Sequence, residues 1–196
     1  MVAKQLKEVF DGYVELNIQV WENFEKLGHV ETYARESVIK ESNTTERYIN
    51  IILKGSGGNL IWHKNNFVCI DIASKNDFLC DYMSFTLQKN SPIEVRLFEE
   101  STIFRLPFSN FKKTFESDNH GSEITRIIAE NSFIEKQQQQ ISLLTKTAKE
   151  RYLEMTKYNN EIKQIPLKYI ASYLGITPQS LSRIRAGNIK ELPNGK

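Results

Sequence analysis

The stretch that decides the fold runs from Pro166 to Ala186 and reads PLKYIASYLGITPQSLSRIRA. Apolar residues recur at helical spacing on both sides of Gly175, which predicts two short helices that meet at this glycine. Glycine is favoured where a helix ends in a left-handed turn, because it has no Cβ to clash. The pattern is typical of a helix-turn-helix. Its apolar positions are Ile170, Ala171 and Leu174 in the first helix, Ile176 in the turn, and Leu181 and Ile184 in the second helix.

The second helix has the start signals and the polar face of a DNA-recognition helix. Thr177 is a good N-cap, and Pro178 suits the first turn, where a missing N–H costs nothing. With the apolar side buried, the remaining side chains face outward and can hydrogen-bond to base edges or phosphates. The alternative is an ordinary helical hairpin in some other core, which fits the placing of the glycine, alanine and apolar residues less well. The residues expected to contact DNA are Lys168, Thr177, Gln179, Ser180, Ser182, Arg183 and Arg185.

Composition and charge support this location for DNA binding. The chain has 196 residues, of which 40% are hydrophobic and 26% charged, as in globular proteins. The net charge of +2 is small, but it is unevenly distributed. Residues 161–196 carry six basic and two acidic side chains, whereas residues 1–116 carry 14 basic and 16 acidic ones. Attraction for phosphates is therefore expected only at the C-terminal end.

Several classes of function are disfavoured by what the sequence lacks. Charged residues interrupt the first ten positions, and no apolar run is long enough for a bilayer, so we expect a cytoplasmic protein without membrane contact. Cys69 and Cys80 have no metal-binding spacing and are expected to be reduced core residues. His29, His63 and His120 are isolated, so neither a metal site, a cofactor nor a cupin-like metalloenzyme is expected.

The region before residue 107 alternates short strand patterns with turn-forming segments. Residues 3–27 come first and show helical periodicity, and Ser109 is expected to cap a short helix that ends at Phe115. Strands at this spacing favour an antiparallel sandwich or barrel, so the fold class is α+β with a jelly-roll-like β-roll. The expected strands are His29–Ala34, Val38–Lys40, Tyr48–Leu53, Asn59–His63, Phe67–Ala73, Ile93–Phe98 and Thr102–Leu106.

A long helix is expected from Ser122 to Lys146, since no Pro or Gly interrupts that segment. Its apolar stripe is too long for a neighbouring β domain to cover, so pairing with a second copy would bury it as a coiled-coil-like seam. The alternative is that the helix packs on the β domain of its own chain. Thr147–Glu150 forms a capping box, which predicts a new helix after the long one. The expected seam residues are Ile127, Ile134 and Ile141.

Three segments resemble the Crp/Fnr superfamily of transcription regulators: YINIILKGSGG at 48–58, ERYLEMTKYN at 150–159 and QIPLKYIASYLGITPQSLSRI at 164–184. The resemblance implies a sensor β-roll over residues 1–116, a dimerisation helix over 117–146 and a DNA-binding domain over 147–196 with at most a minimal wing. It also implies a homodimer whose recognition helices enter successive major grooves about 34 Å apart on near-palindromic double-stranded DNA. RNA polymerase and a small-molecule effector are further partners that it implies.

The match at the recognition helix has one departure. Gln179 stands where many family members have a base-reading Glu. A carboxylate accepts a hydrogen bond from cytosine, whereas a carboxamide both donates and accepts and suits adenine. The preferred half-site is therefore expected to differ from that of the Glu-bearing relatives.

The sensor half departs from the family's cyclic-nucleotide pattern at residues 76–97, NDFLCDYMSFTLQKNSPIEVRL. This segment has no Gly-Glu pair, and its one Arg, Arg96, falls inside the following strand. We expect that cyclic AMP is not the effector, and that any effector is neutral or cationic. A degenerate sensor that acts mainly as a protein-interaction module is the alternative. The expected effector pocket comprises Asp77, Asp81, Asn90, Ser91, Asn131 and Gln138.

Overall fold

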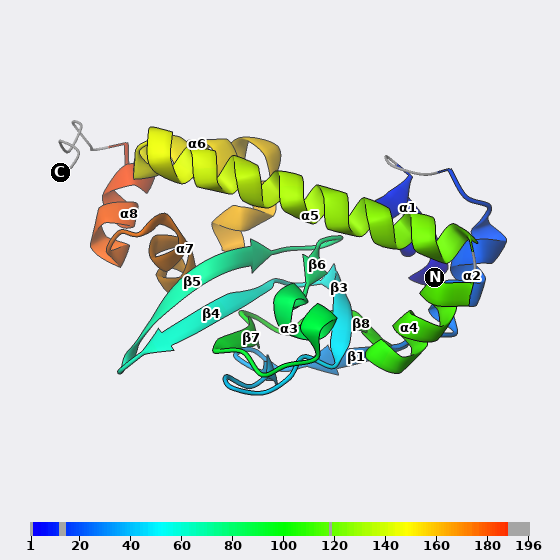
Figure 1. Ribbon diagram of the computed structural model, residues 1–196. Helices are drawn as coiled ribbons and strands as arrows, with labels where there is room; N and C mark the ends of the chain where they lie inside the picture. The colour runs from blue at the N-terminus through cyan, green and yellow to red at the C-terminus, as the bar shows by residue number, and fades with distance from the viewer. Residues whose placement is uncertain (1, 12–14, 118, 188–196) are drawn as a thin grey trace.

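The computed structural model describes residues 2–11, 15–117 and 119–187 of the chain. Two four-stranded antiparallel sheets form the β-roll, with strand orders β1-β8-β3-β6 and β2-β7-β4-β5 (Figure 1). All seven expected strands are present, each within two residues of its expected ends. The strands are β1 (His29–Tyr33), β2 (Val38–Lys40), β3 (Tyr48–Lys54), β4 (Gly57–His63), β5 (Asn66–Ala73), β6 (Phe78–Leu79), β7 (Ile93–Leu97) and β8 (Ser101–Pro107).

The paired strands β3 and β8 are covered on both faces, and most of their side chains are buried. Side chains alternate between the faces of a strand, so neighbouring residues enter different cores. Ile51 and Phe104 pack with the N-terminal helices, whereas Ile52 and Ile103 belong to the core that also contains Leu97 of the other sheet. The β-roll therefore has one core between its sheets and a second beneath the helices.

The N-terminal helices α1 (Val2–Phe10) and α2 (Ile18–Glu25) cover one face of the sheet that contains β3. Phe10 stacks on Trp21 with ring centroids 4.8 Å apart, which joins the two helices. Helix α4 (Phe108–Ser117) starts one residue before Ser109, so the expectation that Ser109 caps it is wrong. The short helix α3 (Tyr82–Leu87) was not expected from the sequence.

The long helix α5 (Asn119–Thr145) runs along the molecule from the N-terminal helices to the C-terminal ones (Figure 1). Its first half packs within the chain, since Ile124 and Ile128 belong to the core beneath the N-terminal helices. Ile127 is only 6% exposed, so this residue, expected in the dimer seam, is already covered by its own chain. Ile134 and Ile141 are 50% and 57% exposed. The alternative interpretation, that the long helix packs on its own chain, therefore applies only to the first half of its apolar stripe.

The C-terminal helices share a hydrophobic core with the β-roll, in which Leu60 and Phe98 pack with Tyr169 and Ile170. The expected capping box at Thr147 is present. The division of the chain at residues 116 and 146 stays a prediction. None of the helices in the described part of the chain combines the length and apolarity that crossing a membrane requires. The C-terminal elements are α6 (Ala148–Tyr158), the 3-10 helix η1 (Asn160–Gln164), α7 (Leu167–Leu174) and α8 (Pro178–Arg185).

Candidate nucleic-acid interface and effector cavity

Helices α7 and α8 meet through the turn that the sequence predicts. Gly175 ends α7 in the left-handed conformation with φ 69°, and Ile176 continues the chain into the core. Thr177 caps α8 by accepting a hydrogen bond from the backbone N–H of Ser180, 3.1 Å away, and Pro178 fills the first turn. Local sequence signals therefore fix the angle at which α8 leaves α7.

The buried side of this unit is apolar, as expected. Ile170 and Ala171 of α7 and Leu181 of α8 are each 0% exposed, and Leu174 is 1% exposed. Ala171 has the smallest side chain among them and lies where the two helices pack together. This burial directs the remaining side chains of α8 outward.

The outer face of α8 carries three exposed polar side chains, Gln179, Ser182 and Arg183. Arg185 is also exposed, and its guanidinium lies 5.6 Å from the ring centre of Tyr152 in α6. An exposed arginine and glutamine on one helix face have the donors and acceptors that read guanine and adenine edges in a major groove. Thr177 and Ser180 do not belong to this outer face. Their hydroxyls lie 3.0 Å apart in the N-terminal cap of α8, where they can hydrogen-bond to each other.

Lys168 is engaged by the β-roll. Its ammonium lies 3.1 Å from the Glu36 carboxylate and 4.6 Å from the ring centre of Tyr169. Glu36 also accepts a hydrogen bond from the Tyr169 hydroxyl and lies 3.5 Å from the Arg96 guanidinium. The sequence gives no local signal for this contact, because 133 residues separate Glu36 from Tyr169.

Glu36 has two properties that set it apart. Its backbone is left-handed with φ 65°, a conformation that residues with a side chain rarely adopt. Its pKa is lowered: partial burial raises it, but hydrogen bonds from Tyr169 and Lys168 and the charge of Arg96 outweigh that effect. The charged form of Glu36 is therefore favoured by the contact with α7.

Two further contacts fix α7 on the β-roll. Tyr169 is 1% exposed and stacks on Phe98, with ring centroids 3.7 Å apart and planes 14° apart. The Ser172 hydroxyl accepts a hydrogen bond from the Cys69 backbone N–H and donates one to the Phe67 carbonyl, both in β5. The first helix of the helix-turn-helix is thus docked on the β-roll, while α8 lies at the end of the molecule with its outer face exposed (Figure 1).

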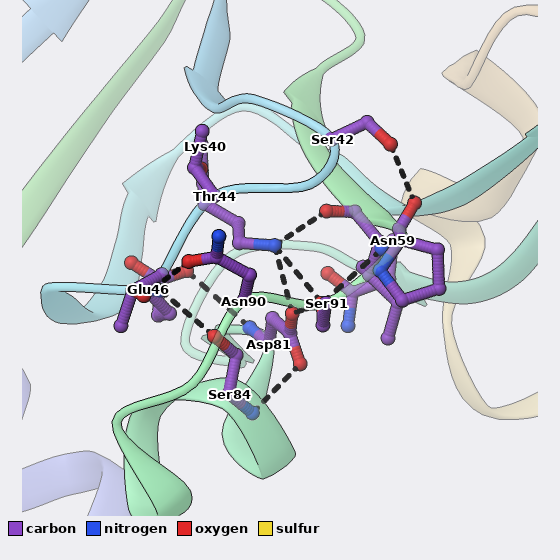
Figure 2. Close-up of polar contacts among 12 residues, drawn as sticks. Lys40, Ser42, Thr44, Glu46, Asn59, Asp81, Ser84, Asn90 and Ser91 are labelled. Atoms are coloured by element: carbon purple, nitrogen blue, oxygen red, sulfur yellow. Dashed lines mark hydrogen bonds and ion pairs between the residues drawn. The ribbon is translucent and has the colours of Figure 1, made fainter.

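A buried ion pair occupies the segment where the family resemblance would locate a phosphate. The Lys40 ammonium lies 2.9 Å from the Asp81 carboxylate, and both side chains are at most 3% exposed (Figure 2). The same ammonium donates to the Ser91 hydroxyl at 3.0 Å and to the Ile93 carbonyl at 2.6 Å. An ammonium has three hydrogens, so these three partners use its full donor capacity.

Asp81 and Glu46 organise the polar groups around this pair (Figure 2). Asp81 caps α3 by accepting from the Ser84 N–H at 3.1 Å, and it also accepts from the Ser91 hydroxyl. Glu46 is 1% exposed and accepts from the backbone N–H groups of Arg47 and Tyr48. Burial raises the pKa of Glu46, and these hydrogen bonds oppose the rise. The network holds β2, α3 and the start of β7 together.

The expected effector-pocket residues are only partly brought together. Asp77, Asp81 and Asn131 line one cavity of about 820 Å³ between the β-roll and α5. Ser91 lies in the Lys40 network, and the exposed Asn90 accepts from the Thr45 hydroxyl at 2.7 Å (Figure 2). Gln138 lines a separate groove between α5 and α6. Sequence reasoning missed Lys40 and Asn59, which reach this region from β2 and β4.

Two other sequence expectations concern metals and the chain end. Among residues 2–11, 15–117 and 119–187, no group of three His, Cys, Asp or Glu side chains is arranged to hold a metal ion. Cys69 and Cys80 are free thiols, and burial raises the pKa of both. The minimal wing was expected in the residues after Ala186. Residues 188–196 lie outside the described part of the chain.

Comparison with known proteins identifies the fold. No protein-family profile matches the chain, and no curated protein matches it. Among solved structures, FixK2 from Bradyrhizobium japonicum matches with a TM-score of 0.69 and 14% identity, over 82% of this chain and 83% of that one. A CooA mutant from Carboxydothermus hydrogenoformans matches with a TM-score of 0.64 and 15% identity, over 93% and 83%. Thermus thermophilus catabolite activator protein matches with a TM-score of 0.54 and 11% identity, over 91% and 85%. These likenesses confirm the expected fold of a β-roll, a long helix and a C-terminal helix-turn-helix.

Proposed function

We propose that this chain is a DNA-binding transcription regulator of the Crp/Fnr type that binds a near-palindromic operator as a homodimer. The observation that carries the proposal is the two-sided character of α8. Leu181 is fully buried against α7, whereas Gln179, Ser182 and Arg183 are exposed. A helix held this way after a tight turn can insert its outer face into a major groove. The similarity in fold to Thermus thermophilus catabolite activator protein supports a regulatory function.

The dimer is proposed to form along the second half of α5. Ile134 and Ile141 are exposed there, and the neighbouring Leu144 is 80% exposed. Exposed apolar residues on one long helix favour pairing with a second copy, because pairing removes that surface from water. Two copies would then present two α8 helices to half-sites about 34 Å apart.

Within the recognition helix, Arg183 and Gln179 are proposed to read bases, and Ser182 and Arg185 to contact phosphates. Thr177 and Ser180 contribute mainly by capping α8, since their hydroxyls interact with each other. Lys168 becomes a phosphate contact only when it leaves Glu36. The affinity for DNA would therefore depend on how α7 packs against the β-roll.

Cyclic AMP is not proposed as the effector. A phosphate at the α3–β7 segment would have to displace the Asp81 carboxylate from Lys40, whose three hydrogens are already used. Displacement would leave a buried carboxylate without a counterion, which is strongly unfavourable. Calorimetric titration with cyclic AMP and cyclic GMP tests this point, and micromolar binding of either nucleotide would contradict it.

The recognition-helix assignment is tested by replacing Arg183 with Ala. The variant is expected to lose about 1–3 kcal/mol of operator binding and to relax specificity at one base pair. Arg185→Ala, which removes a phosphate contact, should weaken all sequences alike and reduce the salt slope by roughly one unit. Fluorescence anisotropy with labelled operator DNA measures both. Unchanged affinity and specificity of the Arg183 variant would refute the assignment.

A further inference from the structure

The last residue of α7 is held by a side chain from α6. The Arg151 guanidinium donates a hydrogen bond to the Leu174 carbonyl, 2.6 Å away. Carbonyls in the last turn of a helix have no partner within the helix. Two others in α7 accept from backbone N–H groups of the turn that follows, and the helix dipole favours a cation at this end. Arg151 therefore fixes the point at which the chain leaves α7 for the Gly175 turn.

The residue before it, Tyr173, is held by the long helix α5. The Gln139 side chain donates to the Tyr173 hydroxyl at 3.1 Å and to the Ile70 carbonyl of β5 at 3.0 Å. A carboxamide nitrogen has two hydrogens, so these two acceptors use its full donor capacity. The end of α7 is thus tied to α5 and to the β-roll through one side chain.

The helices that supply these contacts, α5 and α6, are also connected to each other. Only Lys146 and Thr147 separate them in the chain, and Thr147 caps α6. The Lys146 ammonium lies 2.6 Å from the Glu154 carboxylate of α6, and α6 lies beside the end of α5 (Figure 1). The end of α5, α6 and the end of α7 therefore form one junction.

A groove of about 560 Å³ borders this junction, and Gln139, Arg151 and Tyr173 all line it. Because the groove is open, packed side chains do not fill that side of the junction. The Nε–H of Arg151 is buried and has no acceptor among the described residues. A buried donor without an acceptor costs stability. A contribution to stability alone therefore does not account for this arginine.

We propose that Arg151 and Gln139 are positioning residues that set the direction of α8 relative to α5, and with it the half-site spacing that the dimer accepts. The inference rests on the proposed function, in which α5 carries the dimer seam and α8 enters the major groove. Tyr173 and Leu174 directly precede the turn from which α8 starts, so a change in their position moves α8. Two-fold symmetry repeats the movement in the second copy. A shift of about 1.7 Å along the DNA in each α8 would change the spacing by one base pair, about 3.4 Å.

Positioning residues differ from base-reading residues in what their loss does. Arg183 and Gln179 lie on the outer face of α8 and are proposed to read bases within a half-site. Arg151 and Gln139 lie on other helices, so their loss should leave the base preference of each half-site unchanged and reduce only the preference for one spacing. A mere loss of stability would weaken binding to all spacings alike.

The test is fluorescence anisotropy with labelled duplexes that keep both half-sites and differ only in the length of the spacer. The half-sites are those of the inverted repeat that the parent chain selects from random duplex DNA. The parent is expected to bind the selected spacing about tenfold more tightly than spacers one base pair longer or shorter, because the DNA must deform to fit those spacers.

Two variants remove the contacts one at a time. Arg151→Met and Gln139→Met are each expected to reduce the tenfold spacing preference to about threefold or less, because the DNA then needs less deformation. Arg151→Lys can still donate to the Leu174 carbonyl and should keep most of the preference. Lys149→Met removes one positive charge from an exposed position of the same helix, and as the matched control it should change nothing.

The inference would be overturned if either folded variant kept the parental spacing preference or lost affinity equally at every spacing. The same loss of preference in Lys149→Met would also overturn it, since charge and not the contact would be the cause. Gln139→Met keeps the test decisive if Arg151→Met does not fold. A parent that selects no operator would refute the proposed function and this inference with it. A parent whose spacing preference the variants share would refute this inference alone.

Discussion

Asp81 combines three roles in one buried carboxylate. It caps α3, accepts a hydrogen bond from the Ser91 hydroxyl and neutralises the charge of Lys40. A buried charge without its partner is strongly destabilising, whereas a complete pair is close to neutral compared with apolar residues. Lys40 and Asp81 therefore depend on each other, and the segment from α3 to β7 depends on both.

Replacing Lys40 with Met is expected to lower the free energy of unfolding by about 3–5 kcal/mol, because the buried Asp81 carboxylate would lose its counterion. The double variant Lys40→Met/Asp81→Asn removes both charges but keeps the oxygen that caps α3, so part of the loss should be recovered. Urea denaturation of the three proteins measures the difference. A double variant less stable than the single one would show that the charge is not the cause.

At the scale of the element, α5 has two different halves. Ile124 and Ile128 are buried in the core beneath α1 and α2, whereas Ile134 and Ile141 face solvent. The apolar residues of the first half are therefore part of the monomer core, and the exposed apolar residues of the second half are available to a partner. Substitutions in the two halves should have different effects.

Ile134→Glu is expected to yield a monomer of nearly parental stability, because a charge at an apolar seam opposes pairing while the monomer does not bury this residue. Ile127→Glu is the matched variant on the same helix. It should reduce the free energy of unfolding, since Ile127 is 6% exposed. Sedimentation velocity and urea denaturation separate the two effects, and an unchanged dimer mass for Ile134→Glu would contradict the proposed seam.

Helix α7 is held on the β-roll by a contact that depends on pH. The pKa of Glu36 is lowered from 4.5, so the contact is fully present above pH 4.5 and is lost as the pH falls through the lowered pKa. Glu36→Gln removes the charge at any pH. Because the Glu36 and Lys168 side chains are 30% and 49% exposed, the ion pair contributes at most about 1 kcal/mol.

Glu36→Gln is therefore expected to increase backbone hydrogen exchange in α7 and to raise operator affinity by up to about fivefold, because Lys168 is released. Glu41→Gln, an exposed site on the following loop, is the control and should change neither quantity. Exchange followed by mass spectrometry reports on docking without any DNA. Faster exchange with weaker operator binding would mean that docking helps DNA recognition and does not oppose it.

For the whole molecule, sequence patterns predicted most of the helices and strands and the helix-turn-helix, but they did not predict β6, α3 and η1. The strands are short runs bounded by turn-forming segments, and Gly175, Thr177 and Pro178 fix the turn by local chemistry, which a sequence displays directly. The predicted order of a β-roll, a long helix and a helix-turn-helix itself contributed to the resemblance to the Crp/Fnr superfamily. The expected fold is confirmed by similarity to solved structures.

Contacts between distant segments could not be predicted in this way. Lys40 of β2 reaches Asp81 at the start of α3, and Glu36 reaches Tyr169 across 133 residues. Asn59 gives no signal in the sequence, because only the folded chain shows that its oxygen lacks a donor. The sequence did not show that Ile127 is covered by its own chain, because the helical periodicity is the same whether the same chain or a second copy covers the apolar stripe.

The central claim, that two copies of this chain read a near-palindromic operator, is tested most directly by selecting binding sites from random duplex DNA. The account predicts enrichment of an inverted repeat with half-site centres one helical turn, about 10–10.5 base pairs, apart or a multiple of that spacing. The Arg183→Ala variant should lose preference at one symmetric position of each half-site. Absence of any enriched sequence, or enrichment of a site without two-fold symmetry, would contradict the account.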